Sequence, residues 1–185
     1  MNRIDKEGLP KAKLLKDQAV EGQGDFAAAS TAEMMEMVLP NDANILGNIL
    51  GGKVMHLIDI AAAIAAARHC SQAVVTASVD YLEFRHSIKV GELIIVKAAL
   101  NRVFQTSMEI GAKVWAENLL TGERRHTSSA YLTFVALNSD GKPTPVPSYN
   151  PVTPQEQRRW HEAEIRRASR MQMKSRFVKT DSVPH

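Results

Sequence analysis

The sequence predicts one α+β domain in which a long buried helix is wrapped by a curved antiparallel sheet of about five strands. The chain has 185 residues, enough for one domain of ordinary size. Residues 54–67 form an apolar segment of helical length that is shorter than the roughly 20 residues needed to cross a membrane. Four segments of strand character follow with short connections, and such a sheet can bury a lone apolar helix only by curling around it.

The N-terminal part of the chain divides into an extension, a strand and a loop. Residues 1–29 are polar without sustained periodicity, so we expect a flexible N-terminal extension. Residues 31–39 suit either a strand or a helix, and the proline that follows at position 40 favours a strand. Residues 41–53 contain Asn, Asp and three glycines, which is typical of a loop that runs into a helix. That helix is expected from about Leu50 to about Cys70 and is apolar on nearly all sides, so it should be buried.

The rest of the domain, which we bound at residues 30–147, is predicted to be strands. The segments are rich in Val, Ile, Thr, Ala and aromatic residues with partial alternation. Their connections are short enough for antiparallel neighbours. The four expected strands cover residues 74–84, 92–103, 107–118 and 124–137.

Residues 148–185 are expected to form a proline-containing linker and a basic C-terminal helix or tail. Eight of the 25 residues from 155 to 179 are Lys or Arg and three are Glu, whereas the remaining chain carries two more acidic than basic groups. The net charge of +3 therefore reflects this segment alone. We expect an exposed helix, and both a solvated face and a patch for the phosphates of a ligand or of RNA remain open.

Several classes of protein are disfavoured by what the sequence contains. The single cysteine, Cys70, cannot form an intrachain disulfide, and the N-terminus has no apolar signal segment, so we expect a cytoplasmic protein without membrane insertion. The histidines lack the spacing of a zinc site, and we expect neither a metal nor a cofactor. Motifs of P-loop, dinucleotide-binding and α/β-hydrolase proteins are also missing.

Asp59 is the most informative candidate residue, because it is a carboxylate within an otherwise apolar helix. Burial of an unpaired charge is expensive. Asp59 is therefore either a structural hydrogen-bond acceptor facing solvent or a general base or nucleophile facing a cleft.

Two features precede this helix. Asn44 lies in the loop, where its amide either caps the backbone or reaches a ligand. Gly47, Gly51 and Gly52 permit close approach to the backbone, and the last two lie where free amides at a helix start can polarise a carbonyl group. Plain turn geometry explains them equally well.

Taken in order, several segments resemble the hotdog-fold acyl-CoA thioesterases of bacteria and of animal cytosol. The resemblance covers residues 34–147 and rests on the segments LPNDANILGNILGGKVMHLID, RHC, VVTASVDYLEFRHSIKVGELI, TSMEIGAKVWAENLLTGERRHTSSAYLTFVAL and DGKPTPVP. It implies a hotdog fold, fatty acid metabolism, sheets joined edge to edge in a dimer, and a trimer of dimers, that is, a homohexamer. It also implies that acyl-CoA is the substrate and that coenzyme A enters only as part of it.

The resemblance places the catalytic residues on Asp59 and Asn44, contributed by opposite protomers to one site. It places contacts to the acyl and pantetheine groups at Val75, Thr76, Ala77, Thr106 and Ser107. Relatives have Gly-Arg where this chain has Phe104 and Gln105, so we consider Arg102 as a substitute.

The expected chemistry is hydrolysis of acyl-CoA to a free acid and CoA. Asp59 activates water or attacks the thioester directly, while the amides of Gly51 and Gly52 hold the oxyanion and Asn44 positions the water or the carbonyl. We expect Arg158 and Arg159, with other arginines of the C-terminal segment, to meet phosphates. The alternatives are a catalytically silent acyl-CoA or nucleotide sensor and, in last place, an RNA-binding protein; we expect no nucleic-acid partner.

Overall fold

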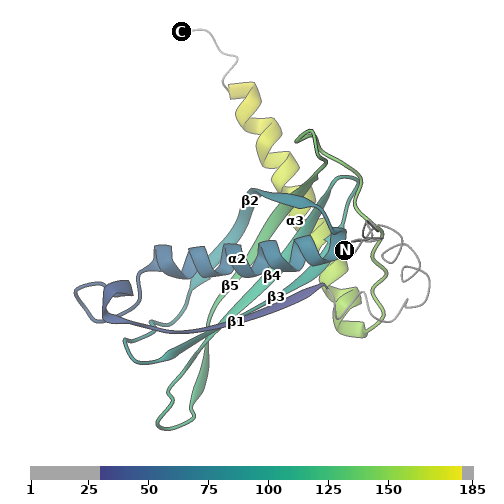
Figure 1. Cartoon of the computed structure of the whole chain (residues 1–185). Helices are drawn as coiled ribbons and strands as arrows, with labels where there is room; N and C mark the ends of the chain where they lie inside the picture. The colour runs from purple at the N-terminus through teal and green to yellow at the C-terminus, as the bar shows by residue number, and fades with distance from the viewer. Residues whose placement is uncertain (1–29, 181–185) are drawn as a thin grey trace, which may run out of the picture.

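The structure is a computed structural model that describes residues 30–180 (Figure 1). The expected extension at residues 1–29 and the last residues of the C-terminal tail lie outside the described part. A short 3-10 turn, η1, covers Pro40–Asp42. The helices and strands are β1 (Thr31–Met37), α2 (Gly51–Cys70), β2 (Ala73–Phe84), β3 (Leu93–Val103), β4 (Ser107–Glu117), β5 (Arg124–Leu137) and α3 (Pro154–Thr180).

The five strands form one antiparallel sheet in the order β1-β3-β4-β5-β2. β3, β4 and β5 follow each other as neighbours, as their short connections predict. The expectation that β2 and β3 are also neighbours was wrong, because β2 pairs with β5 and the segment between β2 and β3 crosses from one edge of the sheet to the other side. β1 and β2 are the two edge strands, and α2 joins them across one face of the sheet (Figure 1). The predicted α+β architecture of a long helix held by a five-stranded antiparallel sheet is confirmed.

Close packing between α2 and the sheet depends on small side chains. Ala61, Ala62, Ala65 and Ala66 of α2 are completely buried. They face an inner sheet surface that mixes larger aliphatic residues with further buried alanines, at positions 98, 112, 116, 130 and 136. Methyl groups on both sides let the helix lie close to the strands, so that dispersion contacts are dense and no large void remains.

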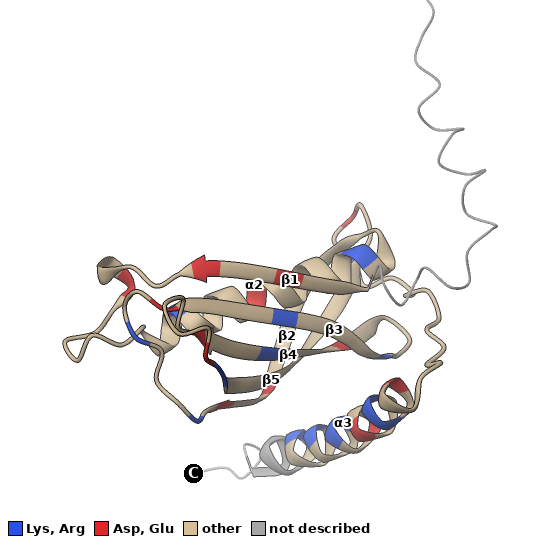
Figure 2. Cartoon of the chain, turned by 90° about the horizontal axis from the view of Figure 1, so that it is seen from below, with Lys and Arg blue, Asp and Glu red and all other residues tan. Residues whose placement is uncertain are grey.

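The expected C-terminal helix is present as α3, and most of its described side chains are exposed. It does not lie free in solvent, because one side rests against the opposite face of the sheet, here called the outer face (Figures 1 and 2). Ala163 is fully buried, and Trp160 packs against the core. Arg166 forms the central contact with the sheet. Its Nη2 donates to Oε1 of Glu109 at 2.6 Å, and its guanidinium lies 3.7 Å from the centre of the Tyr131 ring. Glu109 is 1% exposed and also accepts a hydrogen bond from Asn101.

Two further ion pairs extend this contact along α3. Arg102 of β3 pairs with Glu164 and stacks on Trp160 at 4.3 Å. Arg170 pairs with Asp80 of β2. Three of the basic residues that gave this segment its charge, Arg166, Arg167 and Arg170, are thus engaged with the sheet. Arg102 is occupied in holding α3. No helix within residues 30–180 is both long and apolar enough to cross a membrane.

Replacing Arg166 is expected to destabilise the protein strongly. Arg166→Gln leaves Glu109 buried with only Asn101 as a hydrogen-bond donor, and loss of one partner of a buried pair costs about 3 kcal/mol in the free energy of unfolding. Urea denaturation at fixed protein concentration measures the change.

Arg158→Gln is the matched control, because it removes a guanidinium from the same helix. Its pair with Glu162 is surface-exposed, with Arg158 61% exposed, so a change of about 0.5 kcal/mol or less is expected. Equal effects of the two substitutions would contradict the assignment of Arg166 as the main contact between α3 and the sheet.

Candidate active site

Asp59 lies in the third turn of α2, half-buried, on the side of the helix that faces β2. The hydroxyl group of Thr76 donates a hydrogen bond to Asp59 Oδ1 at 2.7 Å. The pairing of β2 with β5 shifts between Thr76 and Ser78, so a bulge follows Thr76 directly. Within the described chain, the second carboxylate oxygen of Asp59 has no hydrogen-bond partner. One oxygen is therefore oriented and the other is available to accept a proton or to attack.

Asn44 shapes the loop between η1 and α2. Its Oδ1 accepts hydrogen bonds from the amides of Leu46 and Asn48, and Gly47 at φ +73° closes the turn. The capping role considered from the sequence is therefore present. However, capping uses only the oxygen. The side-chain amide NH₂ is exposed and donates to no group in the described part of the chain, so Asn44 can both hold the loop and donate a hydrogen bond to a ligand.

A second loop repeats this geometry far from the candidate site. Asn138 Oδ1 accepts from the amides of Asp140 and Lys142, and Gly141 also has φ +73°. The backbone bonds match as well: Asn44 N donates to Asn48 O, as Asn138 N does to Lys142 O. This twin separates the turn-forming role of an asparagine from any role in chemistry.

The start of α2 presents free backbone donors. Leu50 precedes the helix without a side-chain cap, and the first amides bonded to its carbonyl oxygen are those of Lys53 and Val54. The amides of Gly51 and Gly52 form no hydrogen bond within residues 30–180. A Cβ at Gly52 would meet open space, so a ligand can approach this backbone closely. Free amides and the helix dipole together favour a developing negative charge.

A cavity of about 310 Å³ brings the Asn44 loop and the helix start together. Asp59 is not among its lining residues, so one protomer does not unite the two predicted catalytic residues in this cavity. Sequence reasoning gave no role to Phe84, Arg85 and Ser128, which also line it. Phe84 lies 3.6 Å from where a Cβ of Gly51 would be. Sequence reasoning missed these residues because only the order of the strands shows that the C-terminal end of β2 lies beside the start of α2.

The remaining predicted contact residues lie along the sheet. Val75, Thr76 and Ala77 are exposed on edge strand β2. Ser107 occupies the same row as Val75, with Val135 of β5 between them. Its hydroxyl lies 3.5 Å from Arg167 of α3, so this side chain faces the outer side, away from Asp59. Thr106 precedes it in the turn, and its carbonyl oxygen accepts a hydrogen bond from Ala136. Arg158 and Arg159 belong to the first turns of α3.

An ion pair between Arg125 and Glu92 supports the Asn44 loop. Sequence reasoning did not select either residue. Arg125 of β5 donates two hydrogen bonds to the carboxylate of Glu92, at 2.6 and 2.8 Å, and a third to the Ser87 carbonyl. These bonds hold the segment of residues 87–92, and this segment pairs with the Asn44 loop. Ile49 N donates to Ile88 O, and Val90 N donates to Gly47 O. The bonds from Arg125 are the largest cause that lowers the pKa of Glu92 below its ordinary value.

This pKa predicts a pH dependence of stability. Because the folded-state pKa of Glu92 lies below its unfolded value, the pair contributes fully above the ordinary pKa of about 4.3 and is lost as the pH falls through the folded pKa. The difference in unfolding free energy between wild type and Glu92→Gln should therefore shrink as the pH is lowered from about 6 to about 3. Urea denaturation at each pH measures it. Glu123→Gln, at an exposed glutamate, is the control, and its unfolding free energy should change with pH as that of wild type does. If the difference in unfolding free energy between wild type and Glu92→Gln stays constant over this pH range, the pair does not contribute in the way predicted.

Comparison with known proteins agrees with this geometry. Residues 46–123 match the thioesterase superfamily. The chain is 40% identical over 146 residues to protein VdlD of Helicobacter pylori, covering 79% of this chain and 83% of VdlD. It is 38% identical over 151 residues to the uncharacterized acyl-CoA thioester hydrolase YkhA of Bacillus subtilis, covering 82% of this chain and 87% of YkhA.

Solved structures show the same relationship. A hexameric acyl-CoA thioesterase superposes with a TM-score of 0.77 at 41% identity, covering 80% of this chain and 94% of the other. The acyl-CoA hydrolase of Staphylococcus aureus, solved with butyryl-CoA and CoA, superposes with a TM-score of 0.77 at 30% identity, covering 83% and 94%. The chain therefore belongs to the thioesterase superfamily and is an acyl-CoA thioester hydrolase with the hotdog fold.

Proposed function

We propose that this enzyme hydrolyses acyl-CoA with Asp59 as the general base or nucleophile and Asn44 as a hydrogen-bond donor. The observation that carries the proposal is the state of the Asp59 carboxylate, which Thr76 orients through one oxygen while the other stays free. A carboxylate held in this way can deprotonate a water molecule or attack a carbonyl carbon without first reorganising.

The reaction follows from the two groups of donors. Asp59 takes a proton from water as the water attacks the thioester carbon, or attacks that carbon itself to form an anhydride that water then opens. The amide NH₂ of Asn44 and the backbone amides of Gly51 and Gly52 face the carbonyl oxygen, where negative charge develops. In the first route the carbon–sulfur bond breaks when the tetrahedral intermediate collapses, and the proton taken by Asp59 passes to the sulfur, so that CoA leaves as the thiol. In the second route that bond breaks as the anhydride forms, before water opens the anhydride, and the CoA thiolate takes up the proton that the attacking water releases.

Work on a related enzyme supports these roles. The hydrolase from Staphylococcus aureus has been solved with one aspartate, one asparagine or one threonine replaced by alanine. In that protein the asparagine and the aspartate are 15 positions apart, and the aspartate and the threonine are 17 apart. Asn44, Asp59 and Thr76 have the same two separations. The threonine that holds Asp59 here thus has a counterpart.

Two protomers complete the site in this proposal, through edge-to-edge pairing of their β2 strands. β2 is an edge strand with large apolar side chains that are exposed in one protomer, among them Val75, Val79, Tyr81 and Phe84. Exposed apolar residues on a free edge are typical of an interface. Pairing there brings the partner's Asn44 loop toward Asp59, which explains why the cavity of one protomer contains only Asn44.

The other substrate contacts remain predictions of the sequence. These contacts are Gly47, Val75, Ala77, Thr106, Ser107, Arg158 and Arg159. The trimer-of-dimers assembly, the cytoplasmic location, the role in fatty acid metabolism and activity without a metal or cofactor are also still predictions.

Thiol release from acyl-CoAs ranging from acetyl to palmitoyl tests the catalytic assignment. Asp59→Asn should lower kcat at least 100-fold, because general-base catalysis is lost. Asn44→Ala should lower it by about 100-fold or more through loss of an oxyanion donor.

The twin loop provides the control for the asparagine. Asn138→Ala removes the same turn-forming hydrogen bonds and should leave turnover near the wild-type value. Asp140→Asn is the matched control for the aspartate. Wild-type turnover in Asp59→Asn would exclude the proposed chemistry, and comparable losses in Asn138→Ala and Asn44→Ala would reduce Asn44 to a turn residue.

A charge on the β2 edge should separate the protomers. Val79→Lys places an ammonium group where two edges would meet, and we expect smaller assemblies in light scattering together with loss of turnover at unchanged far-UV circular dichroism. Val152→Lys, at a position 69% exposed in the linker before α3, should keep both the assembly and the activity. Full activity in a monomeric Val79→Lys variant would contradict a site shared between protomers.

A further inference from the structure

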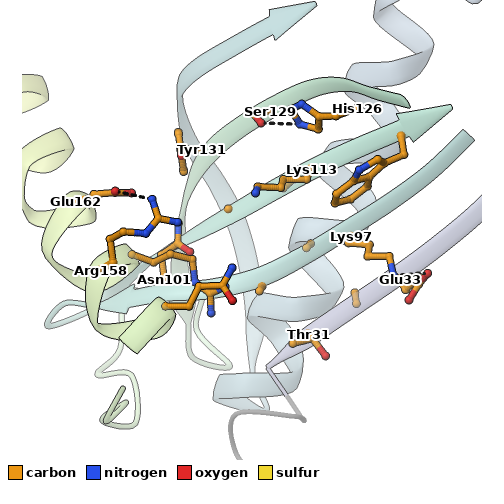
Figure 3. A pocket seen from close by; sticks show the side chains of 18 of the residues that line it. Thr31, Glu33, Lys97, Asn101, Lys113, His126, Ser129, Tyr131, Arg158 and Glu162 are labelled. Atoms are coloured by element: carbon orange, nitrogen blue, oxygen red, sulfur yellow. Dashed lines mark hydrogen bonds and ion pairs between the residues drawn. The ribbon is translucent and has the colours of Figure 1, made fainter. Parts of the chain in front are cut away.

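A second and larger cavity lies on the outer face of the sheet, and from α2 only Arg68 lines it. It has a volume of about 1010 Å³ and lies between the first turns of α3 and strands β1, β3, β4 and β5 (Figure 3). We call it the outer-face cavity. Its size is at the upper end of small-molecule sites. The proposed chemistry at Asp59 makes no use of it.

The charge of this cavity is strongly positive. Its acidic lining residues are Glu33 and Glu162. Glu33 pairs with Lys97 at 3.1 Å, and Glu162 pairs with Arg158 at 2.9 Å and with Arg166 at 3.9 Å. Lys113 and Arg159 form no ion pair within the described chain. The cationic lining residues are Arg68, Arg85, Lys97, Lys113, Arg158 and Arg159.

The excess of positive charge in the cavity affects the pKa of a histidine that lines it, His126. Burial lowers the pKa of His126, and the nearby cations Lys113 and Arg85 lower it further. The effect of Lys113, which forms no ion pair in the described part of the chain, indicates a positive potential beside His126 that an anion would relieve.

Two lining residues also hold a buried polar atom without a hydrogen-bond partner in the described part of the chain, Asn101 Oδ1 and Arg159 Nε. Almost none of the surface of either atom is accessible, so a ligand in the cavity does not reach them. The Arg159 guanidinium can therefore contact a ligand only through its terminal nitrogens.

We propose that the outer-face cavity binds a small anion that carries at least two phosphate groups. Lys113 and Arg159 supply the unneutralised charges, and the width of the cavity suits a ligand larger than one phosphate. Arg85 lines both this cavity and the cavity beside Asn44. The phosphates therefore belong either to CoA that reaches round the sheet edge or to a separate ligand beside the catalytic site.

Isothermal titration calorimetry with inorganic pyrophosphate tests the proposal on the intact enzyme. Pyrophosphate should bind at least tenfold more tightly than orthophosphate, and Lys113→Gln should weaken it about tenfold or more. Lys142→Gln, at an exposed lysine in the turn after β5, is the matched control and should bind as wild type does. Absence of pyrophosphate binding, as a second copy covering the cavity would cause, or equal affinity in Lys113→Gln, would overturn the proposal.

A competition titration identifies the source of the phosphates. If saturating pyrophosphate raises the apparent Kd of CoA in wild type but not in Lys113→Gln, the cavity takes the phosphates of the substrate. Independent binding assigns a separate phosphate ligand, and either result supports the site. Asp59→Asn should bind pyrophosphate as wild type does, so failure of the catalytic proposal is distinguishable from failure of this one.

Discussion

Burial of α2 against the sheet is the constraint on which the rest of the molecule depends. The helix has apolar residues on nearly every side, and its alanines at positions 61, 62, 65 and 66 allow the strands to lie close to it. Because the sheet must curve to cover the helix, its two edge strands, β1 and β2, both lie beside α2. The side of α2 that faces β2 is where Asp59 is found, bonded to Thr76. The candidate catalytic carboxylate is thus placed by the same packing that stabilises the domain.

The outer face of the sheet is organised by charge. α3 is held by the buried pair of Glu109 with Arg166 and by the pairs of Arg102 with Glu164 and Asp80 with Arg170. Such pairs specify where a helix lies, since each joins an arginine to a carboxylate of another element, although their net contribution to stability is smaller than their number suggests. At the N-terminal turns of α3 the balance fails, and the uncompensated cations surround the outer-face cavity (Figures 2 and 3).

The two halves of the candidate site are built by different means. Asp59 is fixed by a helix and a strand, which are rigid elements. Asn44 is fixed by a turn that its own side chain closes and by the Glu92 and Arg125 pair beneath it. Asp59 is thus held by a rigid helix and Asn44 by a supported loop. This arrangement suits a site assembled between protomers, because neither part has to change conformation when the two come together.

The sequence by itself determined the architecture and the chemically important residue types. An apolar helix followed by short, alternating strands permits few arrangements, so the element boundaries and the neighbours β3, β4 and β5 could be predicted closely. The expected pairing of β2 with β3 was wrong, because β2 lies at the other edge of the sheet beside β5. Asp59 could be selected because a carboxylate in an apolar helix requires an explanation. Asn44 could be placed in a turn by its neighbouring glycine, although the sequence left its role open between capping and ligand contact.

Only the tertiary structure decided which side chains meet. The partnership of Thr76 with Asp59 and the support of the Asn44 loop by Glu92 and Arg125 join residues 17 to 33 positions apart, and no local pattern encodes such distances. The docking of α3 against the sheet was missed for the same reason. Its arginines have the local pattern of a solvated helix, and their partners, including Glu109 and Asp80, lie in strands 57 and 90 positions earlier. Local propensity and charge can be read from neighbouring residues in the sequence. Contacts between the helices and the sheet depend instead on the curvature of the sheet and on the order of its strands.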